Sequence, residues 1–293
     1  MTSHESRTIV VCGATGRQGG AVARRLLADG WSLRAMTRSA DKPRARALAA
    51  LGAEVVEADM GEPPTLDAAF AGAYGVFSVQ NPMISGLVGE VEQGKNVATA
   101  AKAAGVQHLV YASAGVGRPT GVGSWDSKLE VEEHMRVLEL PVTILRPMAF
   151  MELMTDKGFY PPVSAWHLMP KLAGRATKIP WLAVTDVGVI AAKAFAEPAR
   201  FVGRTLVLAG DVQSLGECRA MWIEAQGRPP RRFPMPVWLF ERVASADLTT
   251  MWRWLRTGDV PLDTVETRDV HPQALTVRDW LGQTVVGGTS NGG

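Results

Sequence analysis

The sequence is poor in cysteine and carries almost no net charge. Only Cys12 and Cys218 occur among 293 residues, with neither a CxxC pair nor a histidine cluster, which argues against a disulfide framework and a zinc site. Lysine plus arginine total 31 and aspartate plus glutamate 29, so the net charge of +2 implies no polyanionic partner. The basic run at 228–232 is too short for a nucleic-acid surface. We therefore expect neither a metal nor direct nucleic-acid binding.

Long apolar runs are also missing. The most apolar helix-like stretch, Val187 to Ala196, is interrupted by Lys193, and the leading residues MTSHES are polar. Secretion and membrane insertion are therefore not expected. The low cysteine content fits a reducing compartment, so we expect a cytoplasmic protein.

Short apolar runs alternate with helix-length segments from Thr8 to Arg146. The runs are TIVVC, SLRAMT, AEVVEA, YGVFSV, HLVYAS and VTILR. This alternation predicts βαβ units, and hence an α/β fold with a Rossmann-type doubly wound parallel sheet. The runs are apolar throughout, as expected for a sheet that helices cover on both faces.

The composition changes after Pro147. Prolines and aromatic residues are dense up to Trp181, a helical pattern begins near Asp186, the strand-like run RTLVLAG follows, and the remainder is predicted to be helical. We predict a Rossmann domain at residues 1–150, a smaller α/β substrate-side or partner-side region at 151–285 that receives part of the sheet, and a disordered tail at 286–293.

A glycine-rich segment joins the first predicted strand to a helix. Residues 13–20 are GATGRQGG, and the helical pattern AVARRLLADG follows. Gly13, Gly16 and Gly19 have the G-x-x-G-x-x-G spacing, which permits a tight turn and a close approach of pyrophosphate. The helix N-terminus would supply free N–H groups and the positive end of the helix dipole. The segment predicts a dinucleotide site, and a glycine turn without a ligand is the alternative.

The end of the second strand decides which dinucleotide is expected. NAD sites normally place an acidic residue there, whereas this sequence has Arg38. A guanidinium can bind a 2′-phosphate, with Ser39 and Lys42 as additional donors, so we expect NADP(H). A solvated Arg38 is the alternative. Asp59 either accepts from the adenine amino group or begins a turn, and Met60 beside it completes this part of the expected site.

With these residues the chain resembles the NmrA-like family of atypical short-chain dehydrogenases, and within it the NADPH-sensing members. The resemblance covers nearly the full length. Its segments are GATGRQGG, Thr37-Arg38, DSKLEVEE at 126–133, VTILRP at 142–147, FME at 150–152, VTDVG at 184–188 and HPQALT at 271–276. The Ser-Lys-x-x-Val-Glu helix followed by Thr-Ile-Leu-Arg-Pro is far more specific than the glycine loop.

The resemblance implies a cofactor site assembled from several segments. The residues implied at the pyrophosphate are Gly13, Thr15, Gly16, Arg17 and Gln18. Arg38 is implied to hold the 2′-phosphate, and Lys128 to reach the nicotinamide ribose. The segments implied to border the nicotinamide half are Gln80-Asn81 and Pro147 to Phe150.

Two positions depart from the family pattern. Classical members of the superfamily carry a tyrosine four residues before the lysine, where this sequence has Ser124. Many NmrA-like members carry an asparagine after Phe-Met-Glu, where this sequence has Leu153. Of the three tyrosines, Tyr74 and Tyr111 fall in strands and are expected to be packing residues. The missing tyrosine puts the proton donor in doubt.

Three residues are candidates for catalysis. Tyr160 is either a pocket residue or a proline-flanked loop anchor. Ser113 ends the fifth strand, where such sheets bind ligands, and could polarise a carbonyl. Lys128 is an acid/base candidate, because some reductases of the wider group use a lysine near the nicotinamide ring; the alternative is a lysine that only binds ribose.

Two functions fit this pattern. A redox-state sensor or regulator that binds NADP(H), with weak or no dehydrogenase activity, is favoured by the missing tyrosine. An NADPH-dependent reductase of a quinone or another apolar carbonyl compound is favoured by a tryptophan-rich region at positions 166, 181, 252 and 254, although such residues also form cores. The expected partner is a small apolar substrate or a regulatory protein, and the expected assembly is a homodimer.

Overall fold

The computed structural model describes residues 7–155, 164–231, 235–243 and 245–288. The chain forms two compact units. The first comprises the residues up to Gly117, Ser124–Arg146 and Val187–Leu206. The second comprises Arg118–Gly123, Pro147–Asp186 and the residues from Val207 onward. The units are therefore discontinuous in sequence, whereas the predicted division was a single boundary after residue 150.

The first unit is organised around a seven-stranded sheet in the order β3-β2-β1-β4-β5-β6-β9. Its strands are β1 (Thr8–Val11), β2 (Ser32–Thr37), β3 (Glu54–Glu57), β4 (Gly75–Ser78), β5 (His108–Ala112), β6 (Val142–Pro147) and β9 (Thr205–Leu208). Every pair from β3 through β6 is parallel. The order reverses between β1 and β4, which defines the switch point of a doubly wound sheet. The predicted Rossmann-type fold is confirmed.

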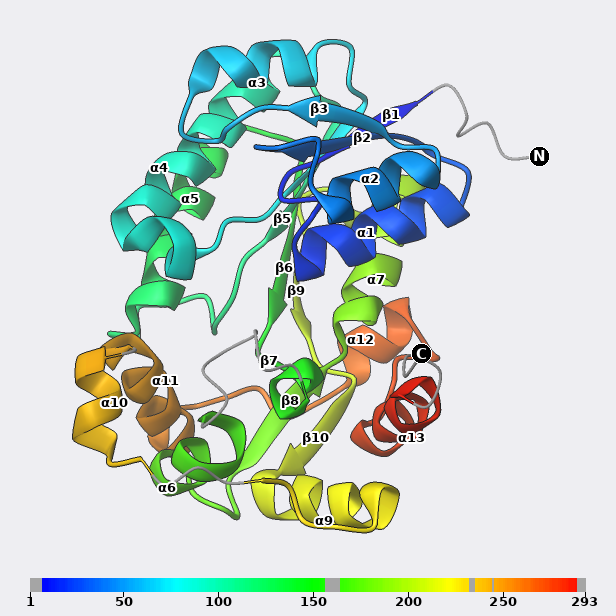
Figure 1. The fold of residues 1–293 in the computed structure, drawn as a ribbon. Helices are drawn as coiled ribbons and strands as arrows, with labels where there is room; N and C mark the ends of the chain where they lie inside the picture. The colour runs from blue at the N-terminus through cyan, green and yellow to red at the C-terminus, as the bar shows by residue number, and fades with distance from the viewer. Residues whose placement is uncertain (1–6, 156–163, 232–234, 244, 289–293) are drawn as a thin grey trace. The chain divides into compact units, whose positions relative to one another are not determined.

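Helices cover both faces of this sheet (Figure 1). They are α1 (Arg17–Ala28), α2 (Pro43–Ala50), α3 (Pro63–Phe70), α4 (Pro82–Ala103), α5 (Gly123–Val137), α7 (Val184–Ala196) and α8 (Pro198–Phe201). Proline occupies the first turn of α2, α3, α4 and α8, where no backbone donor is lost. α4 contains a break at Gly86, whose φ of 73° is left-handed.

The two faces of β5 have different partners. Leu109 and Tyr111 belong to a buried cluster that includes Val97 of α4 and Val131 of α5. His108 points the other way and packs edge-on against Phe195 of α7. The strand is buried at every position, as its continuously apolar sequence predicts.

The second unit contains a small mixed sheet in the order β10-β8-β7. β7 (Ala149–Phe150) is parallel to β8 (Lys178–Leu182), and β8 is antiparallel to β10 (Asp211–Ser214). Around it lie the 3-10 helix η1 (Met151–Met154), the π-helix η2 (Ser164–Leu168) and the α-helices α6 (Met169–Leu172), α9 (Leu215–Gln226), α10 (Val237–Val243), α11 (Ala246–Thr257), α12 (Val265–Val270) and α13 (Val277–Gly288). α13 extends past residue 286, where the predicted tail begins, and residues 289–293 lie outside the described part.

The second unit is held together by two segments of the family pattern. Asp186, only 3% exposed, accepts from the backbone N–H of Leu275 at 3.0 Å and lies 3.3 Å from Nε2 of His271. Trp181 and Trp252 are buried in the core of this unit. The core interpretation therefore accounts for these two tryptophans without a ligand pocket. In the described ranges, no helix is long and apolar enough to cross a membrane.

Candidate functional site

The glycine loop connects β1 to α1, and at Gly16 and Gly19 its backbone leaves little or no room for a side chain. A Cβ on Gly19 would lie 2.3 Å from the carbonyl oxygen of Gly13, and one on Gly16 would lie 3.1 Å from the same oxygen. Gly13 has a φ of 61°, in the left-handed region that glycine tolerates. The loop is closed by the N–H of Gly16, which donates to the oxygen of Gly13 at 2.8 Å.

The start of α1 is suited to an anion. Gly16 occupies the N-cap position without a side-chain cap, and the first turn contains no acidic residue. The side-chain oxygen of Gln18 is buried and has no partner within the described residues. Backbone N–H groups at a helix start, together with the dipole, bind phosphate well. The loop therefore fits the pyrophosphate of a dinucleotide. The residues predicted to bind it lie in this loop and the first turn of α1: Gly13, Thr15, Gly16, Arg17, Gln18 and Gly19.

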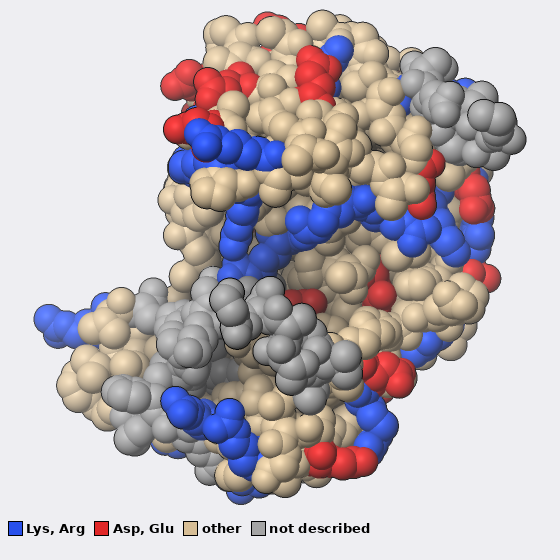
Figure 2. Space-filling model, turned by 45° about the vertical axis from the view of Figure 1, so that its right-hand side comes forward, with Lys and Arg blue, Asp and Glu red and all other residues tan. Residues whose placement is uncertain are grey.

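Basic side chains follow β2. Arg38 is exposed, and its guanidinium has no hydrogen bond or ion pair with the described residues. Lys42 is exposed at the N-cap of α2, and Arg44 donates to the carbonyl oxygen of Thr15 at 3.2 Å, which ties α2 to the glycine loop. The hydroxyl of Ser39 donates to Asp41 at 2.7 Å. Figure 2 shows Lys and Arg side chains gathered in a band across one face of the molecule. This end of β2 can receive a 2′-phosphate.

Asp59 and Met60, after β3, have internal roles. One carboxylate oxygen of Asp59 accepts from the N–H of Gly61 at 2.8 Å, so Asp59 forms the turn that was the alternative to adenine binding. The sulfur of Met60 lies 3.4 Å from the amide nitrogen of Gln80. Gln80 is 4% exposed and also donates to Ser78 at 3.0 Å, whereas its carbonyl oxygen has no partner among the described residues. An unsatisfied buried acceptor after β4, beside the switch point, is suited to a ligand donor.

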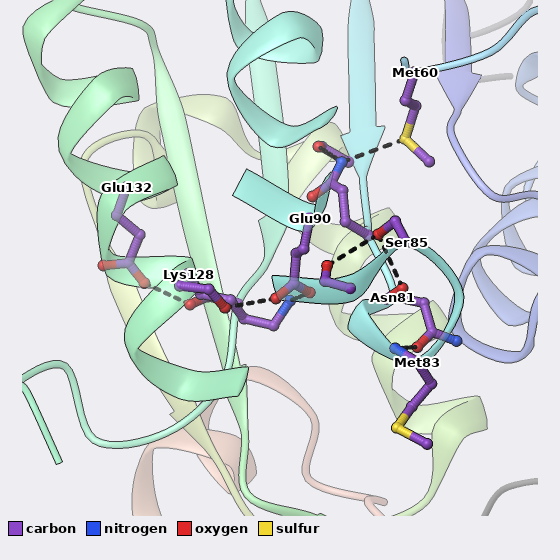
Figure 3. Close-up of polar contacts among 12 residues, drawn as sticks. Met60, Asn81, Met83, Ser85, Glu90, Lys128 and Glu132 are labelled. Carbon is purple, nitrogen blue, oxygen red and sulfur yellow. Dashed lines mark hydrogen bonds and ion pairs between the residues drawn. The ribbon is translucent and has the colours of Figure 1, made fainter. Parts of the chain in front are cut away.

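Lys128 forms a buried ion pair with Glu90. Its Nζ donates to Oε1 of Glu90 at 2.7 Å, and the hydroxyl of Ser127 donates to Oε2 at 2.6 Å. The side chain of Glu90 is completely buried and that of Lys128 is 9% exposed. Figure 3 shows Lys128 reaching from α5 toward Glu90 on α4. The ammonium and the carboxylate thus compensate each other in a place from which water is largely excluded.

A second ion pair, largely but not completely buried, lies close to the first. Ser113, 2% exposed after β5, donates to Glu132 of α5 at 2.5 Å. Both oxygens of Glu132 accept from the guanidinium of Arg146 on β6. Nearby Gly117, with a φ of 77°, leaves room for that guanidinium, since a Cβ there would lie 2.1 Å from it. The hydroxyl of Ser113 is therefore engaged with a carboxylate.

Tyr111 lies near both pairs and is closed off from solvent. It is completely buried, and its hydroxyl has no hydrogen-bond partner in the described part of the chain. Burial raises the pKa of Tyr111 well above its usual range, and the charges of Glu90 and Glu132 raise it further. The Nζ of Lys128 lies 6.0 Å from the centre of its ring. Tyr111 is a packing residue, as its place in a strand predicts.

The remaining predicted residues lie in several places. The side chain of Asn81 caps α4 by accepting from the N–H of Met83 at 2.9 Å. Ser124 lies one helical turn before Lys128 in α5. Pro147 ends β6 and Phe150 lies in β7, both assigned to the second unit. Leu153 lies in η1 of that unit, and Tyr160 lies outside the described residues. The described residues contain no group of three or more His, Cys, Asp or Glu side chains that could hold a metal.

Sequence reasoning missed the role of Glu90. A signal was present, because Glu90, Gly94, Val97, Ala98 and Ala101 are spaced as one face of a helix, and all are buried. Gly94 permits a close approach of α5, since a Cβ there would lie 2.6 Å from Val131. A single acid on an otherwise apolar helix face predicts a buried partner.

The chain is similar to a known protein family over nearly its whole length. The model of the NmrA-like family matches residues 5–281. The chain belongs to the NmrA-like family. A relative within the family, the NmrA-like family domain-containing oxidoreductase FrzB of a Cladobotryum species, is 31% identical over 258 residues, which cover 78% of this chain and 77% of FrzB.

Solved structures with the same fold include a regulator and a reductase. NmrA, described as a negative transcriptional regulator and crystallised with NADP, superposes with a TM-score of 0.78 at 24% identity and covers 98% of both chains. The triphenylmethane reductase of a Citrobacter species, in complex with NADP(H), superposes with a TM-score of 0.77 at 19% identity, over 96% of this chain and all of the other. At these identities the likeness shows the fold.

Proposed function

We propose that this chain binds NADP(H) and acts as a redox-state sensor or regulator with weak or no dehydrogenase activity. One observation carries the proposal: the glycine loop is shaped for a pyrophosphate, while two of the three candidate catalytic side chains, Lys128 and Ser113, already donate to carboxylates of the first unit. Lys128 donates to Glu90, and Ser113 donates to Glu132. General acid catalysis needs a donor that faces the reacting atom.

Within this proposal the residues of the first unit have separate roles. The backbone of the glycine loop and the start of α1 bind the pyrophosphate, and Arg38 binds the 2′-phosphate. Gln80 offers a buried acceptor next to the nicotinamide half, and Lys128 binds the ribose. The nicotinamide ring, when bound, supplies or accepts hydride, and what this chain contributes is the orientation of that ring.

The cofactor choice is tested by calorimetry with NADPH and NADH. We expect NADPH to bind at least tenfold more tightly, and Arg38→Ala to remove most of that difference, because a charge-assisted hydrogen bond contributes about 1.5–3 kcal/mol. Arg46→Ala is the matched control, since Arg46 is also an exposed arginine but lies on α2. Equal affinity of the wild type for NADPH and NADH would contradict the assignment.

A second candidate function is an NADPH-dependent reductase of a quinone or another apolar carbonyl compound. It is favoured by the relative FrzB, which is named an oxidoreductase, and by the fold shared with triphenylmethane reductase. The discriminating assay follows NADPH absorbance with a panel of quinones and aldehydes. The sensor function predicts little or no consumption of NADPH. Reduction predicts turnover that falls roughly 100-fold or more in Lys128→Ala at saturating cofactor and is unchanged in the surface variant Lys95→Ala.

The proposal also includes the partner, the cellular location and the oligomeric state of the protein. The partner is a regulatory protein under the first function and a small apolar molecule under the second. We propose a cytoplasmic location, supported by two free, buried cysteines, and a homodimer. Light scattering after gel filtration tests the homodimer, and a mass of 31.4 kDa would refute it.

A further inference from the structure

The ion pair between Glu90 and Lys128 lies near the edge of the sheet at which doubly wound folds bind ligands. Lys128 approaches the ring of Tyr111, the fourth of the five residues of β5. Glu90 lies in α4, which directly follows Gln80 and Asn81 after β4. The carboxyl ends of these strands, next to the switch point, form the ligand-binding edge of a doubly wound sheet.

The charges of this region are balanced in pairs. Glu132 is matched by Arg146, and Glu90 by Lys128. Because each carboxylate has its own cation, removal of the charge of Glu90 leaves one uncompensated positive charge, on Lys128. Removal of the charge of Lys128 leaves one uncompensated negative charge, on Glu90.

We infer that Glu90 is a positioning residue that, through Lys128, sets the relative affinity of the site for the oxidised and the reduced cofactor. The inference rests on the cofactor site proposed above. The nicotinamide ring carries a positive charge when oxidised and none when reduced. An ammonium without a counter-ion repels the oxidised ring. The ion pair has no net charge, so it interacts about equally with the oxidised and the reduced ring. Glu90 thus keeps both redox states able to bind, so that they compete for the site according to their concentrations.

The geometry separates this role from simple structural support. Both oxygens of Glu90 are used, one by Lys128 and one by Ser127, so the carboxylate is fixed and holds the ammonium in one position. Another ion pair between the same two helices, Lys95 with Glu130, is 3.6 Å long and lies at the surface. Solvent screens that pair, whereas the buried one acts at low local dielectric.

The experiment measures the dissociation constants of NADP+ and NADPH by calorimetry, on the full chain, for four proteins: the wild type, Glu90→Gln, Lys128→Gln and the double variant. Glu90→Gln is expected to raise the ratio of the NADP+ constant to the NADPH constant about tenfold, which corresponds to about 1.4 kcal/mol. Lys128→Gln is expected to lower the ratio, and the double variant to return it to within about threefold of the wild type. The surface variants Lys95→Gln and Glu130→Gln are controls and should leave the ratio unchanged.

The outcomes separate the inference from the proposed function. If the wild type binds neither nucleotide, the proposed cofactor site is refuted and the inference fails with it. If the wild type binds both and the two single variants keep its ratio, the cofactor site stands and the inference is overturned. A change of both affinities by the same factor in Glu90→Gln indicates only structural support and also overturns it. Opposite shifts that cancel in the double variant support it.

Discussion

Gly19→Ala tests the shape of the phosphate loop most directly. Gly19 is the third residue of α1, and a Cβ there would lie 2.3 Å from the oxygen of Gly13, 2.7 Å from its carbonyl carbon and 2.9 Å from the oxygen of Cys12. All three atoms belong to the backbone, so no side chain can rotate away. The loop and the start of α1 must move apart.

The expected magnitude follows from two opposing effects. Overpacking a tight site costs about 1–3 kcal/mol, whereas alanine is favoured over glycine in a helix by up to about 1 kcal/mol. We expect a net loss of about 1–2 kcal/mol in the free energy of unfolding, measured by urea denaturation. We also expect NADPH affinity to fall more than tenfold, because the displaced N–H groups no longer converge on the phosphates.

Gly282→Ala provides the matched control. Gly282 lies in α13, and a Cβ there would meet no atom within 4 Å. The same substitution should therefore stabilise the protein by about 0.5–1 kcal/mol and leave NADPH affinity unchanged. A Gly19→Ala protein that is as stable as the wild type and binds NADPH equally well would refute the reasoning.

Three further predictions concern buried polar groups. Burial lowers the pKa of His108 to about 4 from its usual 6.5. Between these two values the unfolded chain binds a proton at His108 and the folded chain does not. The folded state therefore loses stability as the pH falls from about 6.5 toward 4. Urea denaturation should show a loss of about 2 kcal/mol from this residue between pH 7 and pH 5, absent in His108→Gln. Arg146→Met leaves the largely buried carboxylate of Glu132 without its cation and should cost about 3 kcal/mol in unfolding free energy. The additional change Glu132→Gln should recover most of that loss, and no recovery would argue against the pairing. Tyr111→Phe should alter unfolding free energy by less than about 0.5 kcal/mol, because the hydroxyl it removes has no partner, and a loss above 2 kcal/mol would reveal an interaction of that hydroxyl.

The large parallel sheet could be predicted because its signal is local. Most strands of the first unit are short, largely apolar runs between helical patterns, and the glycine loop marks the first strand-to-helix turn. The small sheet could not be predicted in the same way. β8 contains Pro180, which sequence rules assign outside a central strand, and β10 contains the polar residues Asp211 and Gln213. These short strands depend on pairing with each other.

The candidate site could be predicted where its residues lie close together in the sequence. The glycine loop and Arg38 follow from spacing and position along one βαβ unit. The partner of Lys128 does not, because Glu90 precedes it by 38 residues on another helix, and only the packing of α4 on α5 brings the two together. Pairs of this kind depend on which helix faces pack together. A single sequence indicates which face of each helix is buried, but not which other helix covers it.

The discontinuity of the first unit affects how the protein folds during synthesis and whether a fragment of it can fold alone. The first half of its last strand, β9, and most of α7 come from Val187–Leu206, which the chain reaches only after a long segment of the second unit. Gly188 of α7 meets the backbone of Ala21, and Phe195 fills the space beside Gly75. A nascent chain that ends near residue 150 therefore exposes β6 as an open edge and leaves that face of the sheet partly uncovered. The first unit completes its sheet only after residue 208 has left the ribosome, and a fragment of residues 1–150 should aggregate where the full chain folds.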